Sequence, residues 1–182
     1  MMGESLRGRL LIAAPALLDP NFRRTVLLVV AHDEDGAVGL VLNRISEIEV
    51  AEAVPELAGL GVAGATVSFG GPVQQEAVVV LAEWDDVDEA GDIVFADVGL
   101  MGGEAELERV DAATRRVRIF AGYAGWSAGQ LDAELDEPSW IVGDPIAEDV
   151  FGENADLWAT VLRRMGGAFA FVATMPEDPS LN

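Results

Sequence analysis

The residues of this chain that could do acid–base chemistry begin with a single imidazole. His32 stands beside Asp33 at the end of an aliphatic run, and a neighbouring carboxylate can orient an imidazole that titrates near neutral pH for general base catalysis. Asn43 ends the next aliphatic run and is a third candidate. A histidine at a strand end more often forms a local hydrogen bond or faces solvent. His32, Asp33 and Asn43 are therefore kept as catalytic candidates, and no role is assigned to them.

Other kinds of reactive group are missing from the chain or poorly placed in it. The 182 residues include no cysteine and no lysine, which excludes a thiolate nucleophile, a lysine Schiff base and a phosphate-loop lysine. Thr25, Ser68 and Ser127 carry possible nucleophilic hydroxyls. Ser127 lies in Gly125-Trp126-Ser127-Ala128-Gly129, which matches the letters of the G-x-S-x-G pattern, but it is better explained as a helix cap, so a serine hydrolase is not predicted. The acidic residues of segment 85–89 lack the spacing of a calcium-binding loop. We therefore predict that this segment is a solvated acidic turn. We expect the protein to have neither a metal site nor a cofactor.

A glycine-rich and aromatic segment, FAGYAGWSAGQL at residues 120–131, has two interpretations. In the first, its glycines allow a helix to pack closely on a sheet, with Tyr123 and Trp126 covering the seam. In the second, the segment forms a pocket or a partner surface together with Gly70, Gly71 and Pro72. Ser127 and Gln130 fit a capping box and predict the start of a helix. The candidate binding residues are Gly70, Gly71, Pro72, Tyr123, Gly125, Trp126, Gly129 and Gln130.

The elements that would position these residues follow from hydrophobic periodicity and turn residues. Asp33 to Gly36 is predicted to join two strands as a hairpin, because glycine tolerates the positive φ of such turns. In the last predicted helix, Asn154 can cap the start and Gly166 follows the end. The predicted strands are 8–14, 25–32, 37–43, 66–69, 77–84, 92–98, 116–121, 139–142 and 168–174, and the predicted helices are 50–57, one after Gly103, one from Ser127 to before Pro138, and 154–165.

Composition limits the compartment and the partners. The 32 acidic residues against 11 basic ones give a formal charge of −21, which repels nucleic acid and acidic membranes. The lack of cysteine fits the cytoplasm. Arg7 and Arg9 precede an apolar run as in a signal peptide, but Pro15 interrupts that run, which also suits a core strand. We expect one domain over residues 1–182, with residues 1–6 and 176–182 flexible.

Four segments give the chain a resemblance to the AlgH/YqgE family over nearly its whole length. They are LLIAAPALLDPNFRRTVLLVVAHDEDGAVGLVLNR at 10–44, FGGPV at 69–73, YAGWSAGQLDAEL at 123–135 and the late helix containing Trp158. The resemblance implies an α+β fold, in which a mixed, largely antiparallel sheet curls into an irregular barrel-like body with helices packed outside. Ile45 stands where family members usually have proline, and Gln75-Glu76 where many have Arg-Gly. A role tied to that arginine therefore does not transfer.

Three functional hypotheses follow. The first is a non-enzymatic binding or regulatory module that acts through a protein or small-molecule partner at the glycine-rich segment, where the surrounding acidity favours a neutral or cationic ligand. The second is a hydrolase or transferase centred on His32. The third is transcriptional regulation, which the family label implies. Direct DNA binding is disfavoured, because Arg115, Arg116 and Arg118 form the one compact basic cluster of the sequence.

Overall fold

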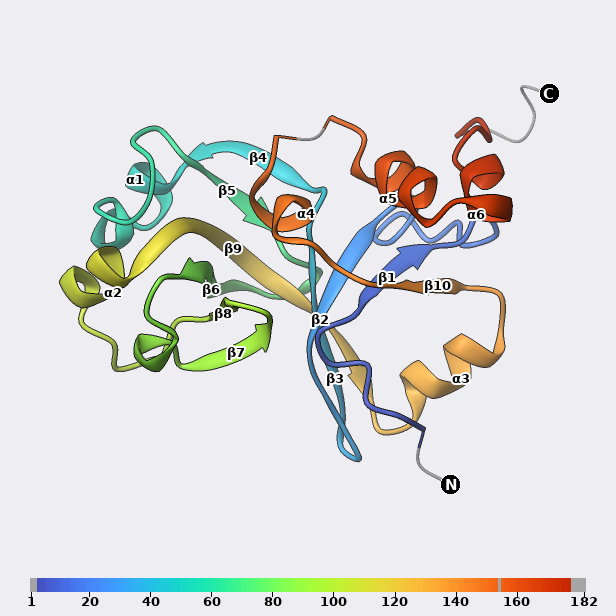
Figure 1. Ribbon diagram of the computed structural model, residues 1–182, viewed down its shortest axis with the longest axis horizontal. Coiled ribbons are helices and arrows are strands. Elements are labelled where there is room, and N and C mark those ends of the chain that lie inside the picture. Colours follow the sequence, from blue (N-terminus) through green and yellow to red (C-terminus); the bar gives the residue numbers. More distant parts are fainter. Residues whose placement is uncertain (1–2, 154, 178–182) are drawn as a thin grey trace.

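The computed structural model describes residues 3–153 and 155–177, in which strands and short helices alternate along the chain (Figure 1). The strands are β1 Leu10–Ala13, β2 Val26–Asp33, β3 Gly36–Val41, β4 Ile45–Glu49, β5 Thr66–Phe69, β6 Val73–Trp84, β7 Asp92–Phe95, β8 Val98–Leu100, β9 Thr114–Ser127 and β10 Trp140–Gly143. The α-helices are α1 Val50–Ala53, α2 Leu107–Ala113, α3 Gln130–Asp136, α4 Ala147–Phe151, α5 Leu157–Met165 and α6 Gly167–Val172, and the 3-10 helices are η1 Pro55–Leu57 and η2 Val87–Glu89.

The strands form one mixed sheet whose order is β10-β1-β2-β3-β9-β6-β8-β7, with β5 beside β9 and β4 beside β5. The β5–β9 pairing is parallel, and the other pairings in the described chain are antiparallel. Figure 1 shows α1 and α2 at one end of this sheet, and α3, α5 and α6 at the other. The expected α+β fold with a curled, largely antiparallel sheet is confirmed. The sheet curls without closing into a barrel.

The apolar residues of β1 show how the sheet is covered on both faces. Leu10 and Ile12 belong to one buried cluster, which includes Trp158 of α5. Leu11 and Ala13 belong to a second cluster, which includes Leu131 of α3. Successive side chains of a strand point to opposite faces, so β1 contributes to a core on each side. A third buried cluster, with residues of α1, η1, α2, β6 and β9, lies at the other end of the sheet.

The hairpin predicted at Asp33 to Gly36 is confirmed. Asp33 of β2 pairs with Gly36 of β3, and Glu34 and Asp35 form the connection between them. The Asp33 Oδ1 atom accepts a hydrogen bond from the Asp35 amide at 2.9 Å, as turn carboxylates commonly do. Gly36 has a φ of 139°, and a Cβ at this position would overlap the carbonyl oxygen of Trp126 on β9. The glycine therefore serves both the turn and the pairing of β3 with β9.

The glycine-rich segment lies mostly in a strand, and not in a loop leading to a helix. Strand β9 runs for 14 residues from Thr114 to Ser127, whereas the sequence predicted a strand ending at residue 121. Gly122 has a φ of 73°, and a Cβ there would lie 2.5 Å from the Gly71 carbonyl oxygen. The glycines therefore let the connection between β5 and β6 pass close to β9. The expectation that they serve helix packing was wrong.

The start of α3 also differs from the prediction. Ser127 is the last residue of β9, and the N-cap of α3 is Gly129, with a φ of 73°. Gln130 does reach back, because its Oε1 accepts the Ser127 amide at 3.0 Å and the Ser127 hydroxyl at 3.2 Å. The Ser127 side chain does not cap the helix. The N-cap position is taken by Gly129, whose backbone is left-handed. The helix ends before Pro138, as predicted.

Several shorter elements were predicted incorrectly. The strand predicted at 92–98 ends at Phe95 as β7, and a second strand, β8, begins at Val98 after a turn that includes Ala96, whose φ is 47°. The range 168–174 contains helix α6 and not an edge strand, and β4 and α4 were not predicted. The start of the last long helix was placed too early, because α5 begins at Leu157. Its N-cap is Asp156, whose side chain accepts the Ala159 amide. Asn154 and residues 178–182 lie outside the described residues, so the cap at Asn154 and most of the predicted flexible tail stay untested.

Candidate functional site

His32 anchors the N-terminal segment. Its Nδ1 atom accepts a hydrogen bond from the Leu6 amide at 3.0 Å, and the Ser5 hydroxyl donates to the His32 carbonyl at 3.1 Å. The carboxylate facing its Nε2 is Asp132 of α3, at 3.9 Å, whereas Asp33 is occupied in its own turn. The His32 side chain is only 9% exposed. These contacts give His32 a local structural role at the end of β2.

Asn43 lies at the opposite end of β2 from His32. Its Oδ1 accepts the Val26 amide at 2.9 Å, and its Nδ2 donates to the Arg24 carbonyl at 2.8 Å. Val26 and His32 are six residues apart on one strand, a separation of about 20 Å. The structure therefore does not bring His32 and Asn43 together in one catalytic site.

The predicted binding residues around the glycines divide into buried and exposed groups. Trp126 is 6% exposed and packs against Phe22 and Trp140, with ring centroids 6.5 and 6.2 Å away. Tyr123 is half-buried and Gly70 is buried, whereas Gly125, Gly129 and Gln130 are exposed. Gly71 and Pro72 line a small cavity of about 160 Å³ beside Arg44 and Phe69. The aromatic ring of Trp126 is thus part of the core and offers little surface to a ligand.

The arginines provide a different candidate site. Six of the 11 arginines, at positions 7, 9, 109, 115, 116 and 164, form ion pairs with carboxylates. No carboxylate of residues 3–153 or 155–177 lies within 4.0 Å of the other five, at positions 23, 24, 44, 118 and 163. Four of these five, all but Arg163, line neighbouring cavities. In a chain with 32 acidic residues, guanidinium groups gathered without carboxylate partners need an explanation.

The larger of these cavities, which we call the arginine cavity, has a volume of about 420 Å³. Arg24, Arg44 and Arg118 line it together with Trp158 and residues of the segment before α5. Three carboxylates also line it, those of Asp149, Asp156 and Glu177. The Asp149 carboxylate is already paired with Arg164, at 2.7 and 2.8 Å, and Asp149 is 4% exposed. Three guanidiniums therefore face two carboxylates without such a partner, which leaves one positive charge in excess.

Arg24 is held in an unusual backbone conformation at the border of this cavity. Its φ is 54°, a left-handed value that is uncommon for residues other than glycine and costs free energy. The hydrogen bond from Asn43 to its carbonyl fixes the backbone, and its guanidinium lies 4.1 Å from the centre of the Trp158 ring. In the described chain its side chain donates one hydrogen bond, to the Met175 carbonyl. Most of its five N–H donors thus remain available to a ligand.

Arg118 holds its charge in a more buried position of the same cavity. Its Nε donates to the Ser68 hydroxyl at 3.1 Å, its Nη1 donates to the Val150 carbonyl at 2.7 Å, and its Nη2 donates to the Leu42 carbonyl. The guanidinium also lies 4.9 Å from the ring centre of Phe120. Burial lowers the pKa of Arg118 to about 10, because the charged form loses hydration. It remains charged at neutral pH.

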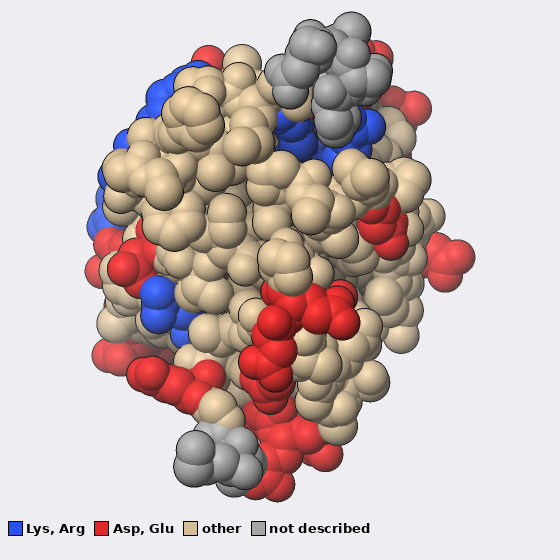
Figure 2. All heavy atoms as spheres, turned by 90° about the vertical axis from the view of Figure 1, so that its right-hand side faces the viewer, with Lys and Arg blue, Asp and Glu red and all other residues tan. Residues whose placement is uncertain are grey.

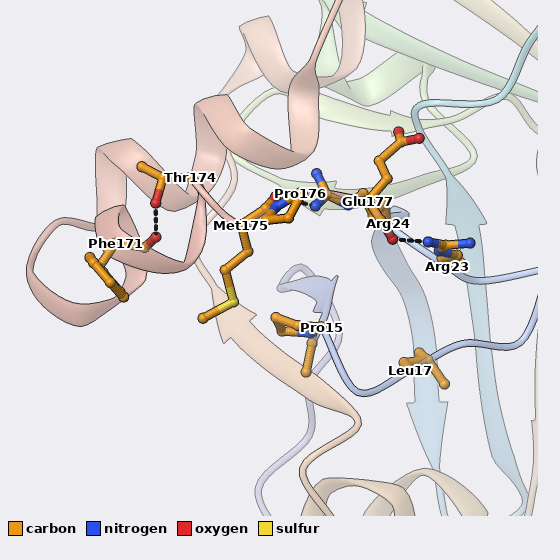
Figure 3. Close-up of a pocket in the computed structure, with 10 residues that line it drawn as sticks. Pro15, Leu17, Arg23, Arg24, Phe171, Thr174, Met175, Pro176 and Glu177 are labelled. Atoms are coloured by element: carbon orange, nitrogen blue, oxygen red, sulfur yellow. Dashed lines mark hydrogen bonds between the residues drawn. The ribbon is translucent and has the colours of Figure 1, made fainter. Parts of the chain in front are cut away.

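A second cavity of about 360 Å³, which we call the apolar cavity, adjoins the first and shares Arg24 and Glu177 with it. Pro15 and Leu17 come from the loop between β1 and β2, and Phe171 and Met175 come from α6 and the segment after it. Figure 3 shows Met175 extending toward Pro15, with Arg23 and Arg24 beside the segment 175–177. The Arg23 side chain donates to the Glu177 carbonyl.

Sequence reasoning missed this site because it treated the arginines as a surface cluster. Phe120 is fully buried, and Arg118 lies two residues before it on β9. Alternation places residues two apart on the same face of a strand, so the pattern already put Arg118 beside core residues. Arg23 and Arg24 entered only as part of the family segment at residues 10–44. Their proximity to the C-terminal segment comes from the fold and leaves no local signal in the sequence.

The described residues contain no group of three or more His, Cys, Asp or Glu side chains placed to hold a metal ion. No helix in this part of the chain has both the length and the hydropathy to cross a membrane.

The acidic side chains of the turn after β6 are engaged in contacts within the protein. The Asp86 side chain accepts the Asp88 amide, Asp85 pairs with Arg115, and Glu89 pairs with Arg109.

The fold and site define an α+β protein with a curled mixed sheet, in which an arginine-lined cavity lies beside an apolar one. Solved structures share this architecture. A crystal structure of a Corynebacterium diphtheriae protein superposes with a TM-score of 0.87 at 26% identity, covering 96% of this chain and 95% of that one. The solution structure of the AlgH protein from Pseudomonas aeruginosa gives a TM-score of 0.73 at 28% identity, covering 97% of each chain.

Sequence comparison identifies the family. A family model described as AlgH-like matches residues 10–170, and the chain belongs to this family. A UPF0301 protein of Streptomyces coelicolor is 43% identical, covering 98% of this chain and 96% of the relative. A UPF0301 protein of Chlorobaculum tepidum is 40% identical over 96% of this chain and 95% of its own length. The resemblance drawn from the sequence motifs is therefore confirmed, and these names describe no activity.

Proposed function

We propose that this protein is a non-enzymatic binding module for a small anionic ligand, which it holds in the arginine cavity. The observation that carries the proposal is the set of three guanidiniums, those of Arg24, Arg44 and Arg118, which line one cavity without carboxylate partners among the described residues. Arginine is well suited to this task, because its planar fork binds carboxylate and phosphate groups with two hydrogen bonds.

The donors for such a ligand come mainly from Arg24 and Arg44. Within the described chain, the Arg44 side chain donates one hydrogen bond, to the Arg23 carbonyl at 2.6 Å, and Arg24 likewise donates one. Arg118 spends most of its donors on Ser68 and two carbonyls, so it contributes charge and shape more than hydrogen bonds. A cavity of about 420 Å³ lies within the size range of small-molecule sites.

The other hypotheses receive less support from the structure. Arg115 pairs with Asp85 and Asp97, and Arg116 pairs with Glu83 and Glu148, so the basic cluster once considered for DNA is largely neutralised. For a hydrolase centred on His32, the fold places Asn43 about 20 Å away, and the His32 Nδ1 atom already accepts the Leu6 amide. A role in regulation would then operate through the bound ligand or a protein partner. We keep the cytoplasm as the proposed compartment, because the chain has no cysteine.

Isothermal titration calorimetry with phosphate, acetate and benzoate at constant ionic strength tests the proposal. We expect the wild type to bind at least one of these anions. Arg24→Gln and Arg44→Gln should each lose roughly tenfold or more in affinity, because hydrogen bonds to charged groups contribute about 1.5–3 kcal/mol. Glu177→Gln should bind several-fold more tightly, because it removes a negative charge that lines the cavity.

Arg163→Gln is the matched control. It makes the same charge change on the exposed face of α5, away from both cavities, and should bind like the wild type. Near-ultraviolet circular dichroism checks that each variant keeps its tertiary packing. No detectable binding of any anion at millimolar concentration, or an equal loss in Arg163→Gln, would show that the arginine cavity is not an anion site.

A further inference from the structure

The two cavities share a border, and this border suggests what kind of anion the site takes. Arg24 and Glu177 line both of them. The Arg24 guanidinium therefore stands between a charged compartment and an apolar one. We propose that the ligand is a monoanionic amphiphile resembling a medium-chain fatty acid, with its carboxylate in the arginine cavity and its chain in the apolar cavity. This inference rests on the proposed function and extends it to the rest of the ligand.

The charge count favours one negative charge on the ligand. Arg24, Arg44 and Arg118 supply three positive charges around the head-group position, and Asp156 and Glu177 supply two negative charges. Asp149 adds none to this balance, because Arg164 binds both of its carboxylate oxygens. A monoanion makes the cavity neutral, whereas a dianion would leave it with net negative charge in a molecule that already carries −21.

The apolar walls favour a hydrocarbon chain over a second polar group. Pro15 and Leu17 form one wall, and Phe171 and Met175 form the other, so aliphatic and aromatic surfaces face each other (Figure 3). Phe171 is 71% exposed and Met175 is 38% exposed. Large apolar side chains exposed around a concave site gain free energy when an apolar ligand covers them. The Met175 side chain is also flexible and adapts to chains of different shape.

The guanidiniums beside the apolar walls are already in contact with the segment that carries Met175. Arg23 donates to the Glu177 carbonyl, and Arg24 donates to the Met175 carbonyl. These hydrogen bonds place the Met175 side chain next to the charged groups. A ligand whose head group reaches Arg24 therefore has its first methylene groups directed along the walls of the apolar cavity.

Calorimetric titration of a chain-length series tests the inference. The probes are acetate, butyrate, hexanoate and octanoate below their micelle concentrations, with 1-octanol as the uncharged analogue. Each added methylene buried in the apolar cavity should raise the affinity about fourfold, from about 0.8 kcal/mol per methylene. Octanol should bind at least tenfold more weakly than octanoate, because it lacks the carboxylate.

Two variants of one helix provide the matched pair. Phe171→Ala should flatten the dependence on chain length and leave acetate binding unchanged, because Phe171 lines the apolar cavity. Phe169→Ala makes the same change on α6 at a residue that does not line it, and should keep the full dependence. Leu17→Ala repeats the test from the opposite wall, and the circular dichroism of all three variants reports on folding.

The outcomes separate this inference from the proposed function. If small anions bind in an arginine-dependent way and affinity does not increase with chain length, the proposal of an amphiphilic ligand is wrong and the proposed anion site stands. If no anion binds, both fail together. If octanol binds as tightly as octanoate, the apolar cavity is an independent site, and the single amphiphilic ligand is likewise wrong.

Discussion

Glu134 shows how one side chain of α3 couples the fold to pH. Burial and the nearby charge of Glu137 raise the pKa of Glu134, whereas a hydrogen bond with the Trp126 side chain opposes the shift. Its Oε2 atom is buried and has no hydrogen-bond partner in the described structure. A carboxyl group whose pKa is raised on folding favours the folded state while it is protonated. This contribution is complete below the unfolded pKa and is lost as the pH rises through the folded pKa.

The first prediction is therefore that Glu134→Gln stabilises the protein at pH 7 and has little effect at pH 4. Glutamine keeps an oxygen for the Trp126 side chain but has no charge to bury. Urea unfolding of both proteins at the two pH values measures the difference. Glu137→Gln on the exposed end of the same segment is the control, and it should shift stability less. Equal effects of Glu134→Gln at both pH values would contradict the role given to burial.

At the scale of elements, strand β9 connects two parts of the sheet, and another segment of the chain passes close to its backbone at Gly122. Gly122 lies where the connection between β5 and β6 passes β9, and a Cβ on Gly71 of that connection would overlap the backbone of Tyr123. Beyond this point β9 pairs with β3 and, at Tyr123 alone, with Val73 of β6, and before it β9 pairs with β5 and the rest of β6. The glycine-rich segment thus links two parts of the sheet, which is a structural role distinct from the binding role first considered for it.

The second prediction compares two glycines with the same φ of 73° in different surroundings. Gly129→Ala meets no atom within 4 Å, so its cost should come from the backbone alone and be about 1 kcal/mol. Gly122→Ala places a Cβ 2.5 Å from the Gly71 carbonyl oxygen and should cost roughly 3 kcal/mol or more. Chemical denaturation gives both values. Similar costs at the two positions would mean that close backbone approach is not what requires glycine at residue 122.

The elements also show what the sequence could and could not predict. The β2–β3 hairpin was predictable because its signals, Asp33 and Gly36, are local. Helix α6 was mistaken for a strand because a short apolar run carries no clear periodicity. The arginine cavity combines residues from positions 24, 44, 118 and 156–158, which tertiary packing alone brings together. Asn43 was selected by its place at the end of an apolar run, and nothing in the sequence indicates that its amide donates to the Arg24 carbonyl, far from His32.

At the scale of the whole molecule, the negative charge is unevenly distributed over the face that Figure 2 shows. Figure 2 shows acidic side chains gathered over the lower part of one face, and a wide uncharged area with some arginine atoms above them. The lower part corresponds to the end of the molecule that carries α3 and the β2–β3 hairpin in Figure 1. The cavities beside α5 and α6 lie toward the other end. Local attraction at the arginines can therefore operate within a molecule whose net charge is −21.

The third prediction concerns the repulsion among these charges. At 10 mM NaCl the screening length is about 30 Å and the acidic groups repel across the molecule, whereas at 150 mM it falls to about 8 Å. The melting temperature at pH 7 should rise between these two concentrations, by about 2–4 °C for each kcal/mol of repulsion relieved. Potassium chloride should act like sodium chloride. Near pH 4.1, the isoelectric point that the amino-acid composition gives, the net charge should vanish and the salt dependence should disappear with it. A rise that persists unchanged there would point to specific ion binding in place of general screening.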